Sequence, residues 1–238
     1  MYDYHKQNIN NIEKYDSSKT NIDDIISMDL GMGNLMTIYN PSGDQRIVKG
    51  GDLINTNEFY NKLIAKSKSE NNLELTRRLF KKRENVLNYK LNRIVSVLFN
   101  KYQNKKEIIV GYNEGWKQHV NLGRNTNRKF YEIPYARILN KMRDKFENTR
   151  IIEVFEGYTS KCDSLMLESI GFHEEYSGNR IKRGLFSSGS KKLINADLNG
   201  AINIMRRYCK NSGIEFGKKV KGSEIYNPTV LKLTPRSH

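Results

Sequence analysis

Three acidic residues stand where short apolar segments end or where a helical segment begins. Asp29 follows an apolar pair, Glu156 closes a strand-like run, and Asp197 opens an amphipathic stretch. Carboxylates brought together from separate elements supply the hard oxygen ligands that cations such as Mg²⁺ prefer. Two such cations about 3.5–4 Å apart can clamp the attacking and leaving oxygens of a phosphodiester. The pattern predicts a two-metal centre that cuts nucleic acid.

Each of these carboxylates also has a plainer structural alternative. Asp29 could cap the turn that follows its strand, and Glu156 could be a solvated residue at a strand end. Asp197 could serve as an N-cap or first-turn residue of its helix. Glu114, in a polar loop, is a rival to Glu156. Glu153 precedes Glu156 by three positions, so the two would point to opposite faces of a strand.

The charge of the chain points to a polyanionic partner. Its 238 residues carry 41 Lys and Arg against 26 Asp and Glu, a net charge of +15. Neutralising phosphates releases counterions, so such an excess favours binding to nucleic acid. A surface charge that only keeps the protein in solution is the alternative. The basic residues are spread along the chain, which suits an extended groove.

Cysteine usage and hydropathy exclude several classes of protein. Cys162 and Cys209 are too few for a disulfide scaffold and fit a reducing compartment. A zinc ribbon needs four ligands in paired short spacings, and adding His173 gives no regular spacing, so structural zinc is not expected. No apolar run approaches the ~20 residues of a membrane span, and the polar N-terminus is not a secretory signal. We expect a cytoplasmic, nucleoid-associated protein.

The elements that must position the carboxylates can be placed from the pattern of apolar residues. Residues 1–22 are polar and predict a disordered leader. Three strands joined by short turns then predict an antiparallel meander, over 24–31, 35–39 and 45–49. Further strands are predicted over 107–112 and 151–155, and helices over 133–148 and 197–208.

A helical hairpin is predicted over about 57–105, with its turn at 70–72. Its leucine-rich spacing is interrupted by a basic face that we expect to bind nucleic acid, formed by Arg77, Arg78, Lys81, Lys82 and Arg83. A merely solvated helix face is the alternative. Lys182 and Arg183 are two further candidates for nucleic-acid binding.

The order of these elements predicts an α/β fold of the RNase H-like (RuvC) type, a mixed sheet with the helical hairpin inserted. Right-handed crossovers would place the later strands parallel to the first, so the first and fourth strands become neighbours. The domain would span 23–208. Residues 157–194 are expected to be irregular, with a flexible piece at 187–190, and 209–238 form a peripheral basic tail.

Several of these motifs resemble the TnpB (OrfB) proteins of insertion sequences over roughly residues 24–208. The segment 28–35 is similar to their first RuvC motif, and 195–204 to their third, the most specific of the matches. Residues 158–162 resemble their Thr-Ser-x-x-Cys segment. Residues 182–186 resemble a subgroup without an intact zinc ribbon, so 159–194 would be a degenerate ribbon.

The resemblance implies an RNA-guided DNA endonuclease, associated with a transposon and related to compact type V CRISPR effectors and to Fanzor proteins. Asp29 and Asp197 would be the first and third ligands of two Mg²⁺ ions, with Mn²⁺ as a substitute. Some members carry a relocated second ligand before the Tyr-Thr-Ser segment, where Glu156 stands. DNA and a guide RNA would be the partners.

The chain departs from the family pattern in two ways. The fourth predicted strand leads into Gly111-Tyr112-Asn113 where a glutamate is usual, so a nuclease-inactive, nucleic-acid-binding member is the alternative function. Only 28 residues precede Asp29, which leaves no room for the usual wedge and recognition module. A missing N-terminal module or a partner subunit is therefore expected, and a decayed remnant is a third alternative.

Overall fold

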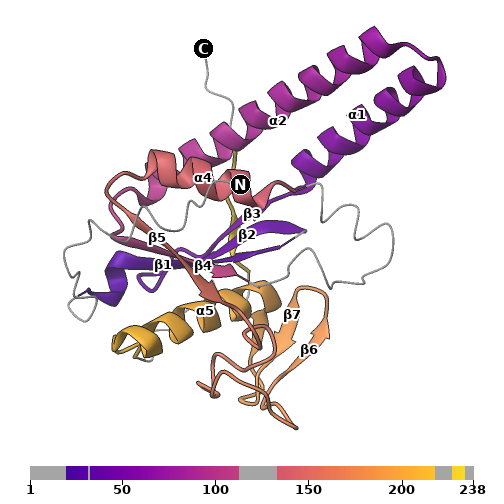
Figure 1. Ribbon diagram of the computed structural model, residues 1–238. Helices are drawn as coiled ribbons and strands as arrows, with labels where there is room; N and C mark the ends of the chain where they lie inside the picture. The colour runs from indigo at the N-terminus through magenta and orange to yellow at the C-terminus, as the bar shows by residue number, and fades with distance from the viewer. Residues whose placement is uncertain (1–19, 32, 113–132, 218–226, 234–238) are drawn as a thin grey trace.

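The computed structural model describes residues 20–31, 33–112, 133–217 and 227–233. Its centre is a six-stranded mixed sheet with the strand order β5-β4-β1-β2-β3-β9, crossed by helices on both faces (Figure 1). The strands are β1 (Ile25–Leu30), β2 (Asn34–Tyr39), β3 (Arg46–Lys49), β4 (Glu107–Tyr112), β5 (Arg150–Phe155) and β9 (Thr229–Val230). The five strands predicted from the sequence are all present.

The pairing of the strands confirms the predicted topology. β2 runs antiparallel to β1, and β3 antiparallel to β2, which forms the meander. β4 then pairs in parallel with β1, with Met28 opposite Val110, and β5 pairs in parallel with β4. The first and fourth strands are thus neighbours, and β1, β4 and β5 end at the same edge of the sheet.

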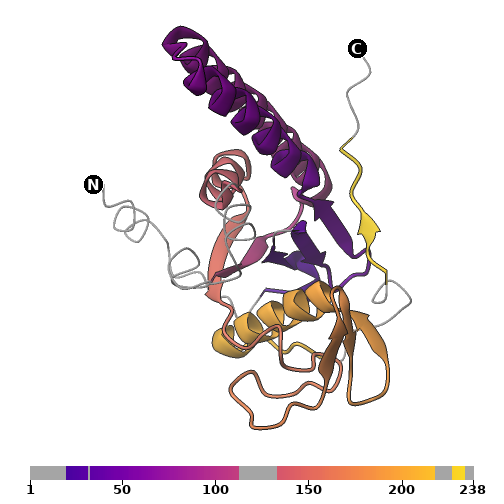
Figure 2. The same cartoon turned by 90° about the vertical axis from the view of Figure 1, so that its right-hand side faces the viewer.

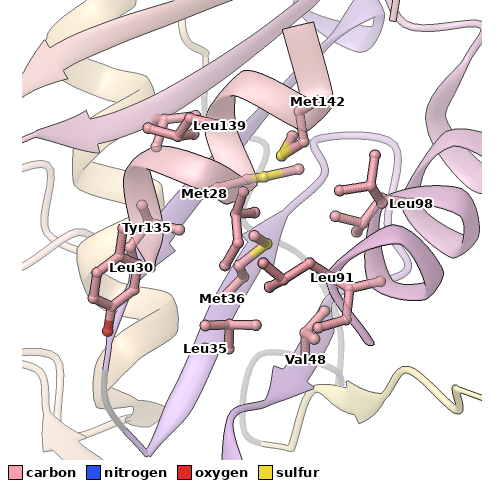
Figure 3. Packing of buried hydrophobic residues seen from close by; sticks show 14 of the residues in the cluster. Met28, Leu30, Leu35, Met36, Val48, Leu91, Leu98, Tyr135, Leu139 and Met142 are labelled. Atoms are coloured by element: carbon pink, nitrogen blue, oxygen red, sulfur yellow. The ribbon is translucent and has the colours of Figure 1, made fainter. Parts of the chain in front are cut away.

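Two apolar clusters bury the two faces of this sheet. Met28 and Leu30 belong to the first cluster, which packs against α2 (Leu73–Tyr102) and α4 (Tyr135–Lys145), as Figure 3 shows. Ile25 belongs to the second cluster, which packs against α5 (Ala196–Ser212). Successive side chains of a strand alternate between its faces. Asp29 therefore points to the α5 face.

Helices α1 (Gly51–Ser69) and α2 form a long hairpin that projects away from the sheet (Figures 1 and 2). The predicted turn is confirmed, because Asn72 caps α2 and its side chain accepts a hydrogen bond from Leu75 N at 2.9 Å. The helix begins at Gly51 rather than near residue 57, since Leu53 is buried in the core and fixes the first turn. Within the described parts of the chain, no helix combines the length and the apolar character needed to cross a membrane.

The expectation of an irregular segment over 157–194 is wrong for its second half. A small three-stranded antiparallel sheet forms there, from β6 (Asn179–Lys182), β7 (Leu185–Ser187) and β8 (Leu193–Asn195). The strands are too short for an alternating pattern, and all of β6 is exposed, so hydrophobic periodicity could not reveal them. The piece at 187–190 is also not flexible, because Ser188 and Gly189 both donate to the buried Asp163.

The expectation of a peripheral tail also needs correction for the described part of 209–238. Helix α5 continues to Ser212, where Gly213 in the left-handed conformation (φ 68°) ends it. Cys209 lies in the second cluster. Farther on, β9 pairs in parallel with β3, and Leu231 packs against the first cluster. Apolar residues spaced along a basic segment thus add an edge strand to the sheet.

Candidate active site

Asp29 lies near the end of β1 on the face covered by α5. The glycine at position 200 lets this helix approach, because a Cβ atom there would lie 2.4 Å from Asp29 Oδ2. One turn farther along, Ser27 Oγ donates to Ala201 O at 2.6 Å and fixes the strand to the helix. The side chain of Asp29 is therefore held against the N-terminal part of α5 and does not cap the turn at Gly31.

Glu156 is the first residue after β5. Its N–H donates to Tyr112 O at 2.8 Å, so the β4–β5 ladder continues one residue past the strand. Its carbonyl accepts from Thr159 N at 3.1 Å and from Thr159 Oγ1 at 2.7 Å. A Cβ atom on Gly111 would lie 2.6 Å from Glu156 Oε2, so this carboxylate lies over β4.

The neighbouring acidic residue faces the other way, as the strand period predicts. The carboxylate of Glu153 pairs with Arg143 of α4, on the far side of the sheet from α5. A Cβ atom on Gly111 would also meet the α5 residue Ile204, which places Glu156 on the α5 side. Glu114, the rival of Glu156, lies outside the described residues.

Asp197 is in the first turn of α5 but does not cap it. The cap is Asn195, whose side chain accepts from Asp197 N and Leu198 N, both at 3.1 Å. The carboxylate of Asp197 points instead toward two other strands. Its Oδ2 accepts from Asn34 Nδ2 at 2.7 Å, and its Oδ1 lies 3.6 Å from a guanidinium nitrogen of Arg180.

The three predicted carboxylates come together electrostatically. Burial raises the pKa of Asp29 well above its ordinary value, and the charges of Glu156 and Asp197 raise it further, while Arg180 lowers it. Burial, with Asp29 and Glu156, also raises the pKa of Tyr135. Like charges act in this way only at short range. The ends of β1 and β5 and the start of α5 thus gather negative charge in one place.

Gathered charge is not yet a closed metal-binding group. Within the described residues, no three His, Cys, Asp or Glu side chains stand close enough together to hold a metal ion. The direct partners printed by the geometry at Asp197 are Asn34 and Arg180. The carboxylates are thus arranged around a common point, with hydrogen-bond and charge partners between them.

The predicted nucleic-acid-binding residues fall in two places. Arg77, Arg78, Lys81 and Lys82 are exposed on the hairpin, whereas Arg83 is half-buried and donates to Asn61 Oδ1 at 2.6 Å. Lys182 and Arg183 are exposed at the β6–β7 turn. The guanidinium of Arg183 lies 3.0 Å from the place of a Cβ on Gly33, so this turn borders the carboxylates.

Sequence reasoning missed three residues of this site. Asn34 stands in the first motif, and a polar residue opening an apolar strand was the available signal. Gly200 stands in the first half of a helix, where glycine is unfavourable unless close packing requires it. Arg180 lies in an exposed, unpatterned strand, and nothing local distinguishes it from other surface arginines.

Comparison with known proteins gives the fold. No family model and no curated protein matches the chain. A cryo-EM structure of a Cas12f1–sgRNA–target DNA complex is similar, with TM-score 0.55 and 20% identity over 77% of this chain and 50% of that one. So is a CRISPR–Cas12f ternary complex, with TM-score 0.57 and 19% identity over 76% of this chain and 38% of that one. The chain has the RuvC-type, RNase H-like fold and spans half or less of the length of these neighbours.

Proposed function

We propose that the chain is an RNA-guided DNA endonuclease of the TnpB and Cas12 type that cleaves phosphodiesters with two Mg²⁺ ions. The coupling of Asp29 to Glu156 and Asp197 at one edge of an RNase H-like sheet is the observation that carries this proposal. Charges that raise one another's pKa are costly to the folded protein, and divalent cations remove that cost.

The residues at the site fit hard divalent cations. All three ligands offer carboxylate oxygens, which Mg²⁺ prefers and which suit Mn²⁺ as well. The absent Cβ atoms of Gly200 and Gly111 leave room beside Asp29 and Glu156, at the points where the side chains must approach. When bound, the ions would activate a water and stabilise the leaving oxygen. Asn34 would keep Asp197 oriented toward them.

The basic surface supports nucleic-acid partners. Four exposed cations on the hairpin, Arg77, Arg78, Lys81 and Lys82, would contact phosphates of the guide RNA or of the RNA–DNA duplex. Such contacts read backbone shape and leave sequence choice to base pairing. The structural neighbours are complexes with an sgRNA and target DNA, which is consistent with this assignment.

The hairpin assignment can be tested by salt dependence. Replacing those four residues by Gln should reduce the slope of log K against log salt for RNA binding by about three units. The control is Lys66, Lys62, Glu58 and Glu70 of the same hairpin replaced by Gln, which leaves the formal charge unchanged. An unchanged slope in the fourfold basic variant would assign these residues to a merely solvated face.

A nucleic-acid-binding protein without catalysis is the second candidate. It is favoured by one observation, that no three metal-ligating side chains among the described residues stand close enough for a metal ion. This candidate predicts salt-sensitive binding and no cleavage with any divalent cation. Transposon association remains part of our proposal and rests on the TnpB-like motifs alone.

The deciding experiment is to express the chain with its flanking DNA, purify it and sequence the RNA that accompanies it. A single defined RNA supports guided cleavage, and target DNA is then cut in Mg²⁺ by the wild type. Asp29→Asn, Glu156→Gln and Asp197→Asn should abolish that cutting, because each removes a ligand charge. Glu114→Gln is the control for the second ligand. Loss of cleavage in Glu114→Gln with none in Glu156→Gln would overturn the assignment, and bulk RNA without cleavage would favour the second candidate.

A further inference from the structure

Arg180 brings a positive charge from the small sheet to the carboxylates of the main sheet. It stands on β6, and its guanidinium lies 3.6 Å from Asp197 Oδ1. It also lowers the pKa of Asp29, so its charge acts on two of the three carboxylates. The small sheet therefore supplies a cation to the place where negative charge gathers.

The two direct partners of Asp197 are held with different firmness. Asn34 is fixed from both ends, because its Nδ2 donates to Asp197 Oδ2 at 2.7 Å and its Oδ1 accepts from Lys49 Nζ at 2.8 Å. Both Asn34 and Lys49 belong to strands of the main sheet. Arg180 is 48% exposed on a wholly exposed strand, and its 3.6 Å approach is longer than a hydrogen bond.

A divalent cation would affect these partners differently. A carboxylate oxygen has two lone pairs, so Asp197 can keep the hydrogen bond from Asn34 while it binds a metal. The metal would repel the guanidinium of Arg180 at the same short range. The contact that yields is then the looser one, from Arg180.

We propose that Arg180 is the counter-cation of the carboxylate centre, and that a divalent cation must displace it from Asp197 to bind. This inference rests on the proposed function, because it takes Asp197 to be a metal ligand. Arg180 thus lowers the apparent metal affinity and couples the position of β6 to metal occupancy. It stabilises the carboxylates before the metal arrives, and its release frees the edge of the small sheet.

Metal affinity measured without nucleic acid tests this role. Mn²⁺ is titrated into the full chain, and the free ion is followed by electron paramagnetic resonance. Arg180→Gln removes the charge and keeps a polar side chain, and it should bind Mn²⁺ about three- to tenfold tighter than the wild type. The matched control is Lys192→Gln, the same charge change at an exposed position next to β8, with an expected change below about twofold.

A second measurement keeps the test independent of the variant's stability. In the wild type, Mn²⁺ should speed hydrogen exchange at the amides of β6, and in Arg180→Gln the metal should leave those rates unchanged. Equal or weaker Mn²⁺ binding by a folded Arg180→Gln overturns the inference. If Asp197→Asn binds Mn²⁺ as tightly as the wild type, the metal centre itself is wrong and the proposed function fails with it.

Discussion

The main sheet and the small-sheet region, residues 157–195, are stabilised by different kinds of contact. Both faces of the main sheet are covered by apolar clusters, with Leu98 of α2 fully buried at the centre of the first. The small-sheet region has few buried apolar side chains, among them Phe186 and Ile194. Its interior instead holds a buried carboxylate, that of Asp163.

Asp163 connects two separate segments of the small-sheet region through hydrogen bonds. Its Oδ2 accepts from Ser188 Oγ and Gly189 N, both at 2.7 Å, while its Oδ1 accepts from Leu165 N at 2.9 Å. Glu168 adds a second link, accepting from Asp163 N and Ser177 N, both at 2.7 Å. A buried carboxylate is tolerated only when its oxygens are satisfied in this way. The comparison teaches that one half of the site is fixed by packing and the other by polar contacts.

The largest effect should come from the core of the main sheet. Leu98→Ala leaves a cavity between α2 and the sheet and should lower the free energy of unfolding by about 2–5 kcal/mol. Urea denaturation measures this value. Leu73→Ala on the exposed start of the same helix is the control and should change little. A small loss in Leu98→Ala would mean that the first cluster does not carry the fold.

A somewhat smaller effect is expected in the small-sheet region. Asp163→Ala leaves the buried donors of Ser188 and Gly189 unsatisfied and should cost about 3 kcal/mol. Hydrogen exchange should then speed up in β6–β8 while the main sheet stays protected. A chelator should not alter the wild-type melting temperature, since carboxylates rather than zinc link these segments. A chelator-induced loss of β6–β8 protection would contradict this account.

The contact between the main sheet and α5 should show an intermediate effect that is centred on the site. Gly200→Ala places a Cβ 2.4 Å from Asp29 Oδ2 and should cost about 1–3 kcal/mol by overpacking. Mn²⁺ binding should weaken as well, because Asp29 must shift. Gly51→Ala is the matched control, since a Cβ there meets nothing within 4 Å. Equal behaviour of the two variants would show that α5 does not constrain Asp29.

The smallest effect is a difference in pH dependence between the two regions. Burial raises the pKa of Glu168, but hydrogen bonds from Ser177 and Asp163 outweigh it, so the pKa lies below its ordinary 4.5. The folded state then binds fewer protons than the unfolded state near that pH. The stability from Glu168 is present above pH 4.5 and is lost as the pH falls through the lowered value. Asp29 has a raised pKa and the opposite dependence.

Hydrogen exchange of β6–β8 at decreasing pH, corrected for intrinsic rates, measures this effect. Glu168→Gln should remove the loss of protection that the wild type shows below pH 4.5. Glu174→Gln, in the same region, is the control. A wild type whose β6–β8 protection does not change on acidification would separate Glu168 from the stability of the small sheet.

The sequence by itself determined the order of elements and the places of the three carboxylates. Apolar segments flanked by turn residues marked β1 to β5, and Asp29, Glu156 and Asp197 lie where those segments end or α5 begins. Those signals are local, because burial of a strand or a helix face leaves its own period in the chain. The boundaries shifted where a buried residue such as Leu53 extended an element.

The tertiary structure decided which polar groups meet. Asn34 and Asp197 are 163 positions apart, and their 2.7 Å hydrogen bond depends on how α5 crosses the sheet. Arg180 reaches Asp197 only because β6–β8 pair with one another and adjoin the start of α5. Strands as short and exposed as β6 leave no periodic signal, so their partners come from hydrogen bonds that form after the main sheet has brought distant segments together.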